Sequence, residues 1–232
     1  MNKKRLPSPP YNPGVGELVR NKRQWSEPLS LETRKRGFLG WHEAGRLPHR
    51  DEPGLVQFVT FRLVDTFPAE LRGEWETLLK IENDRKRRTE LEAYLDRGHG
   101  SCHLRQPEIA VLVEGALRFF HGERYGLRAW VVMPNHVHVL FLVQEVPMSQ
   151  VLDSWKGYTA RQANKLLGRE GQFWQEGYWD TYMRDEEHEQ QTVRYTENNP
   201  VKAGLTKTPQ DWSWTSARFR DEYARLQLPS KP

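Results

Sequence analysis

Two histidines near the middle of the chain, His136 and His138, have a spacing that suits metal ligands. They lie in the run HVHVLFLV, which follows Met-Pro-Asn and alternates the imidazoles with aliphatic side chains. Residues i and i+2 of a strand point to the same face of a sheet, so we expect the two rings to be neighbours. Neutral imidazole binds divalent metals well, whereas two adjacent imidazolium ions repel each other. The pattern predicts a half-buried metal site; the alternative is a pair of hydrogen-bonded structural histidines.

The helix expected after these histidines, residues 148–168, carries Tyr158 and Gln162 one turn apart on the same face. An amide oxygen suits a hard divalent ion, so Gln162 is a candidate third ligand. A phenol can act as a nucleophile, which makes Tyr158 a candidate catalytic residue; the alternative is a packing residue with its hydroxyl at the surface. Lys156 and Arg161 flank these positions and are candidates for neutralising a phosphate.

The first 50 residues are strongly basic. They hold 11 lysines and arginines against four aspartates and glutamates, in clusters separated by prolines and glycines. An extended basic arm of this composition can track a phosphate backbone, and a solubilising tail is the alternative. Aromatic residues of the C-terminal part can stack on unpaired bases, although most of the tryptophans are expected to pack in the interior. The DNA-contacting residues that we predict are Lys35, Arg36, Lys156, Arg161 and Trp174.

Composition excludes several other classes of protein. The chain has 232 residues, a charged fraction of 28% and a single cysteine, Cys102, which excludes an internal disulfide framework and cysteine-based zinc sites. No apolar run approaches the roughly 20 residues that span a membrane, and the N-terminus shows no apolar signal segment. We therefore expect a cytoplasmic protein without a membrane partner, associated with the nucleoid when it is bound to DNA.

Hydrophobic patterning predicts alternating strands and helices. The order strand, helix, strand, strand, helix, strand is typical of an α+β, ferredoxin-like (split βαβ) fold, with an antiparallel sheet that carries helices on one face. The domain organisation predicted is a basic arm over 1–50, a catalytic domain over 51–200 and a C-terminal extension over 201–232. The expected strands are 54–64, 125–133, 136–143 and 178–185, and the expected helices are 68–98 (one or two), 106–122, 148–168 and 186–199, the last stopped by Pro200.

Several blocks of the chain resemble, in order, one branch of the HUH endonucleases: the single-tyrosine, IS200-like transposases called REP-associated tyrosine transposases. The blocks are GLVQFVTFRL, AWVVMPNHVHVLFLV, SWKGYTARQANKLLG, FWQEGYWDTYMRDEEH, and YTENNPVKAGL followed by DWSWTSA. The resemblance implies a ferredoxin-like core that cleaves single-stranded DNA through a 5′-phosphotyrosine intermediate with a divalent ion, Mg²⁺ or Mn²⁺. It also implies that His136, His138 and Gln162 are metal ligands and that Tyr158 is the nucleophile.

The same resemblance implies a substrate, namely single-stranded hairpins of repetitive extragenic palindromic DNA. We expect a monomer, with a dimer as the alternative. Two other functions remain open at this level: a noncatalytic nucleic-acid-binding regulator on the same fold, and a metal-dependent hydrolase without a covalent step. Tyr158 is preferred as the nucleophile because Gln162 follows one turn later. The further tyrosines downstream are Tyr178, Tyr182 and Tyr195.

Overall fold

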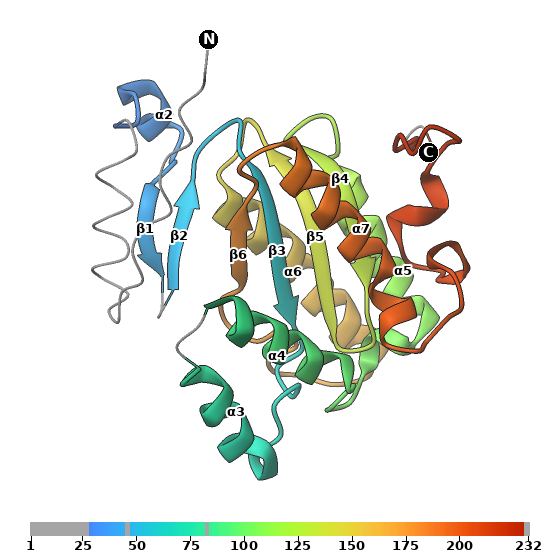
Figure 1. Ribbon diagram of the computed structural model, residues 1–232. Coiled ribbons are helices and arrows are strands. Elements are labelled where there is room, and N and C mark those ends of the chain that lie inside the picture. Colours follow the sequence, from blue (N-terminus) through green and yellow to red (C-terminus); the bar gives the residue numbers. More distant parts are fainter. Residues whose placement is uncertain (1–27, 45–46, 82–83, 230–232) are drawn as a thin grey trace.

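A four-stranded antiparallel sheet forms the centre of the molecule (Figure 1). The computed structural model describes residues 28–44, 47–81 and 84–229. The strand order, β4-β5-β3-β6, places the first and third strands of the unit in the middle, as in a split βαβ fold. The α+β fold with an antiparallel sheet is thus confirmed. The strands are β3 (Val56–Arg62), β4 (Tyr125–Val132), β5 (His136–Val143) and β6 (Trp179–Tyr182).

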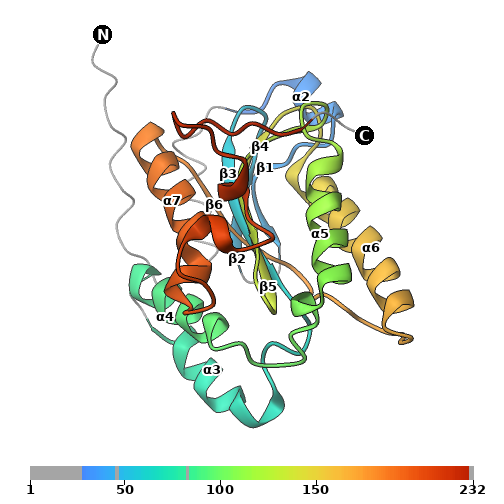
Figure 2. The same ribbon diagram turned by 90° about the vertical axis from the view of Figure 1, so that its right-hand side faces the viewer.

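Helices cover both faces of this sheet, not one face as the sequence analysis expected. Figure 2 shows α5 (Pro107–Phe119) and α6 (Met148–Leu166) on one side and α7 (Glu186–Lys202) on the other. The reason is that β5 is buried on both sides. Its odd-numbered residues belong to the core that α5 and α6 contribute to, whereas Leu140 packs in a second cluster against α7. The histidines share the face of Leu140 because strand side chains alternate.

The basic segment does not stay extended up to residue 50. A short helix, α2 (Leu31–Lys35), is capped by Ser30, and strand β1 (Gly40–Ala44) pairs antiparallel with β2 (Leu47–Asp51). Apolar side chains among the basic ones account for this: Phe38 and Trp41 are buried. A hydrogen bond between His49 and Asp180 joins β2 to β6. The remainder of the predicted arm, residues 1–27, lies outside the described residues.

The segment between β3 and α5 holds two helices, in agreement with the prediction of one or two. Helix α3 (Arg72–Leu79) precedes α4 (Asp84–Asp96), which lies next to α7 on the histidine face of the sheet (Figure 2). An ion pair between Lys202 Nζ and Asp96 Oδ2, at 3.4 Å, connects the two helices. The short 3₁₀ helices are η1 (Ala69–Leu71), η2 (His103–Arg105), η3 (Pro209–Asp211) and η4 (Ser216–Phe219).

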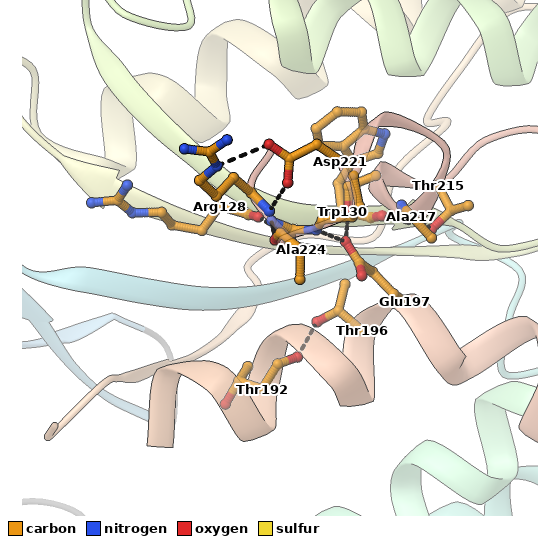
Figure 3. Close-up of polar contacts among 12 residues, drawn as sticks. Arg128, Trp130, Thr192, Thr196, Glu197, Thr215, Ala217, Asp221 and Ala224 are labelled. Atoms are coloured by element: carbon orange, nitrogen blue, oxygen red, sulfur yellow. Dashed lines mark hydrogen bonds and ion pairs between the residues drawn. The ribbon is translucent and has the colours of Figure 1, made fainter. Parts of the chain in front are cut away.

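Helix α7 continues through Pro200, which was expected to stop it. Proline costs a helix one backbone hydrogen bond, but the next turn still forms, because Ala203 N donates to Asn199 O at 2.9 Å. The C-terminal segment then holds the helix in place (Figure 3). Glu197 of α7 accepts from Ser216 Oγ at 2.5 Å and from Arg220 Nε at 2.8 Å, and Arg220 also donates to a backbone carbonyl of β4. These contacts fix α7 against the sheet.

Candidate metal and catalytic centre

The two histidines of β5 meet inside the molecule, as their spacing predicted. Both side chains are fully buried, their ring centroids are 4.7 Å apart, and His136 Nε2 lies 3.1 Å from His138 Nε2. Burial lowers the pKa of both rings, that of His138 from 6.5 to about 3. The imidazoles are therefore neutral at physiological pH, which is the state in which they bind metals.

The outer nitrogens of the rings are held by neighbouring side chains. His136 Nδ1 lies 2.7 Å from Asn135 Oδ1, and Asn135 Nδ2 donates to the carbonyls of Leu95 and His99. Because that amide nitrogen donates, Asn135 Oδ1 must accept, so His136 Nδ1 carries the proton and its Nε2 carries a lone pair. His138 Nδ1 lies 2.8 Å from Thr60 Oγ1. Such outer contacts orient metal-binding imidazoles.

Helix α6 lies on the other face of the sheet. Its Trp155 and Ala163 belong to the core that contains Val137 and Val139, the strand residues that point away from the histidines. Tyr158 is 45% exposed on this helix. The prediction that Tyr158 and Gln162 join the histidine pair is therefore wrong. The prediction took the next helix in the chain as the neighbour, but the split βαβ topology puts that helix on the opposite face.

Helix α7 brings a different tyrosine to the histidines. The Tyr195 ring centroid lies 5.7 Å from that of His138 and 5.9 Å from that of Phe58. One turn later, Asn199 is fully buried and its Nδ2 donates to the Tyr195 hydroxyl at 3.3 Å. Asn199 Oδ1 is buried without a hydrogen-bond partner within the described part of the chain. The sequence signal was the same i, i+4 spacing of a phenol and an amide that favoured Tyr158.

Two carboxylates of α4, those of Glu92 and Asp96, interact with the Tyr195 hydroxyl. Burial is the largest cause that raises the pKa of Tyr195 well above its usual value, followed by the charge of Glu92, a hydrogen bond with it, and the charge of Asp96. Lys202 offsets part of this negative charge, since its Nζ pairs with Asp96 and lies 5.7 Å from the centroid of the Tyr195 ring. Tyr195 is thus a neutral phenol with a carboxylate beside its proton.

Arg62 places a positive charge on the same face. It lies opposite His136 in the register of β3 and β5, so both side chains leave the sheet on the same side. Its guanidinium stacks between two rings, with centroid distances of 4.5 Å to Phe67 and 4.6 Å to Trp179. Burial lowers the pKa of Arg62 to about 10, so the group remains charged at neutral pH. This charge also helps to lower the pKa of His136.

The donor set around the histidines fits a divalent cation. Two Nε2 atoms face each other, and the buried Asn199 Oδ1 is an oxygen donor on the helix that covers them. Within residues 28–44, 47–81 and 84–229 there is no group of three His, Cys, Asp or Glu side chains arranged to hold a metal. The buried amide oxygen of Asn199 is a candidate third ligand, of the chemical type that was predicted for Gln162.

The residues predicted to contact DNA have diverse environments. Trp174 is 4% exposed and donates from Nε1 to Thr159 Oγ1, so the prediction that it stacks on bases is wrong. Lys156 Nζ donates to the backbone carbonyls of Gln175 and Gly177, which fixes a loop. Of the other residues predicted to contact DNA, Arg36 pairs with Glu145 at 3.0 Å. Lys35 and Arg161 are exposed.

Comparison with known proteins gives the class of the central segment. Residues 116–199 match the family model described as "Transposase IS200 like". This confirms the IS200-like resemblance for a segment that contains both histidines and also both Tyr158 and Tyr195. The match therefore does not choose between the tyrosines, whereas the structure separates them.

A second comparison found similarity to one REP-associated tyrosine transposase. The REP-associated tyrosine transposase of Escherichia coli (strain K12) is 28% identical over 105 residues, which are 45% of this chain and 61% of that protein. The chain thus matches less than two thirds of the length of this relative. A solved structure of the REP-associated tyrosine transposase bound to a REP hairpin has a TM-score of 0.46 at 18% identity, covering 82% of this chain and 100% of that one. Separately, none of the helices that the structure describes has the length and apolar character needed to cross a bilayer.

Proposed function

We propose that this protein is a metal-dependent single-stranded DNA transesterase of the IS200-like transposase class, with Tyr195 as its nucleophile. The observation that carries the proposal is that Tyr195 lies against His138. Both histidines point to this face of the sheet. Transposase activity in general follows the class of residues 116–199. The assignment of each residue's role is ours.

His136, His138 and Asn199 are the residues that would hold a divalent ion, Mg²⁺ or Mn²⁺. When bound, such an ion polarises a phosphate and orients it for in-line attack. Arg62 adds a fixed positive charge beside the histidines and is suited to a nonbridging phosphate oxygen. Asn135 and Thr60 keep the two imidazoles in position through their outer nitrogens.

The covalent step exchanges one phosphodiester bond for another. The Tyr195 phenol oxygen attacks the phosphorus, the bond between phosphorus and the 3′ oxygen of the neighbouring nucleotide breaks, and the 5′ phosphate becomes attached to Tyr195. Glu92 is placed to take the phenolic proton, and the released 3′ oxygen gains a proton to become a hydroxyl. The reverse reaction with another 3′ hydroxyl rejoins DNA without a nucleotide cofactor, because the bond is conserved in the phosphotyrosine.

The substrate that we propose is a DNA hairpin with a single-stranded flank, of the repetitive extragenic palindromic type. Support comes from the names of the relatives, one REP-associated and one bound to a REP hairpin. The basic residues of the N-terminal segment agree with a polyanionic partner. We further propose that the protein acts as a monomer on chromosomal DNA in the cytoplasm.

A pair of tyrosine variants tests the proposal. The protein is incubated with labelled single-stranded hairpin DNA from around its own gene and Mn²⁺ or Mg²⁺, and products are separated on a denaturing gel. Tyr195→Phe should abolish both cleavage and the slow-migrating protein–DNA band, while Tyr158→Phe should retain them. The Phe variant loses one oxygen, so hairpin binding should survive in both.

Two other results would redirect the assignment. Metal-dependent cleavage without a covalent band in the unaltered protein would indicate hydrolysis by an activated water. Hairpin binding without cleavage under any metal condition would indicate a noncatalytic regulator. Either result would contradict the transesterase proposal.

A further inference from the structure

An open groove of about 520 Å³ lies along α7, between this helix and η3. Its size falls in the range of about 300–1,000 Å³ that is common for small-ligand sites. Six of its residues come from α7 and two from η3. The lining residues are Gln191, Arg194, Tyr195, Glu197, Asn198, Lys202, Pro209 and Gln210.

The groove adjoins the proposed nucleophile. Tyr195 contributes to its wall and also contacts His138, so the same ring borders both the groove and the buried centre. Lys202 is a second residue shared by the groove and the centre, because it lines the groove and its Nζ lies 5.7 Å from the centroid of the Tyr195 ring. A strand whose phosphate reaches Tyr195 therefore has a path into this groove.

The lining has the chemistry of a nucleotide site. Gln191, Asn198 and Gln210 supply carboxamides, which can donate and accept at a base edge at the same time. Arg194 supplies positive charge for a phosphate, whereas Lys202 is already paired with Asp96. The only carboxylate in the lining, Glu197, is already neutralised by Arg220 and bonded to Ser216, so it opposes a bound phosphate little.

We propose that the groove binds one unpaired nucleotide next to the phosphate that Tyr195 attacks, and that its carboxamides select the base. This inference rests on the proposed function for the position of the strand, but it concerns recognition and not catalysis. A carboxamide forms its paired contacts most readily with adenine, at N6 and N7, so adenine is the base we expect to be preferred. Selection at this position would give the protein a sequence preference that hairpin shape alone cannot supply.

The chain offers a matched control for this site. Gln190 and Gln191 are consecutive exposed residues of α7, and each donates to a glutamate one turn earlier, at 3.3 Å and 3.2 Å. Only Gln191 lines the groove. Replacing either by alanine removes the same helical contact and introduces a good helix former, so the two variants should be equally well folded. Any difference between them in DNA binding then reports on the groove.

The experiment is a binding selection in EDTA, which measures recognition without cleavage. Hairpins with randomised single-stranded flanks are bound to the unaltered full-length protein, to Gln190→Ala, to its matched partner Gln191→Ala, and to a Gln191→Ala/Asn198→Ala double variant, and the bound pools are sequenced. The unaltered protein and Gln190→Ala should enrich one base, expected to be adenine, at one flank position. The double variant should reduce that enrichment about tenfold and keep its affinity for the hairpin stem within a few fold.

The outcomes separate the inference from the proposed reaction. A double variant with the same base preference as the unaltered protein would overturn the inference, and so would an equal loss of affinity for all flank sequences. Absence of any base preference in the unaltered protein would overturn it as well. Loss of the preference in the double variant supports the groove even if a parallel denaturing gel shows no covalent band, in which case only the proposed transesterase reaction fails.

Discussion

Asn135 and Asn199 are the two amides of the metal site that we propose around the histidine pair. Asn135 fixes the proton of His136 on the outer nitrogen, and Asn199 has a buried oxygen without a partner among the described residues. Neither residue was identified from the sequence, where His136 and His138 stand out by their alternation but asparagines are common in turns and at helix ends. The histidine pair was predictable because strand periodicity is local; its amide partners depend on contacts far along the chain.

A metal-affinity series tests this arrangement at single residues. Asn199→Ala should weaken Mn²⁺ binding because it removes a proposed ligand, and Asn135→Ala should weaken it about 10- to 100-fold because His136 loses its orienting acceptor. Gln162→Ala, on the opposite face, should have the affinity of the unaltered protein. Titration calorimetry with Mn²⁺ measures all three. A strong effect of Gln162→Ala together with none of Asn199→Ala would restore the sequence-based choice of ligand.

At the scale of elements, local sequence patterns predict the strands and most helices, but they do not predict which elements pack against each other. Strands β3, β4 and β5 and helices α5 and α6 lie within a few residues of their predicted bounds. Helix α7 was also predicted, apart from its continuation through Pro200. What the pattern lacked was a reason to place α7 on the histidine face. The histidines make that face of β5 look polar, and Leu140 of β5 and Ala129 of the neighbouring strand β4 were too few to indicate a second layer.

One contact between elements also makes a pH-dependent prediction. Buried Asp51, the last residue of β2, accepts a hydrogen bond from Met148 N at the start of α6, at 2.9 Å. Burial is the largest cause that raises the pKa of Asp51 above the usual 3.8; the hydrogen bond from Met148 N lowers this pKa, and the charge of Asp180 raises it. A carboxyl with a raised native pKa loses folded-state stability as pH rises from 3.8 through that native value. Asp51→Asn keeps an acceptor and removes this loss.

We therefore expect Asp51→Asn to match the unaltered protein near pH 3.5 and to become the more stable of the two by pH 7. Asp51→Ala lacks the acceptor and should be destabilised at both pH values, by about 1–2 kcal/mol. Urea unfolding of the three proteins at the two pH values measures these differences. A stability gap between Asp51→Asn and the unaltered protein that narrows with rising pH would contradict the account.

At the scale of the whole molecule, charge and active centre belong to different parts of the chain. Residues 1–27 hold six lysines and arginines, while the histidines, Tyr195 and their partners lie on the α7 face of the sheet. All of residues 1–50 were predicted to form one extended basic arm, but α2, β1 and β2 are folded, so this prediction now applies only to the residues before them. Aromatic residues such as Phe38, which is buried, indicated that part of this segment folds, but the many basic residues drew attention away from them.

Deletion of residues 1–27 should weaken binding to all DNA sequences alike. Each lost phosphate contact should flatten the slope of log affinity against log salt concentration by about 0.7–0.9, because fewer condensed counterions are released. Covalent adduct formation at saturating DNA should persist, since Tyr195 and its neighbours remain. Fluorescence anisotropy over a salt series measures the slope, and a deletion that changed the preferred sequence would show instead that this segment reads bases.

The attachment site of the DNA tests the central claim most directly. The covalent product formed by the unaltered protein on a hairpin substrate is digested with a protease and a nuclease, and the peptide that retains a nucleotide is sequenced by mass spectrometry. The modified residue should be Tyr195, within the peptide YTENNPVK, because this tyrosine lies against the histidine pair. A nucleotide on Tyr158, which α6 places on the opposite face of the sheet, would contradict the active centre described for α7 and β5.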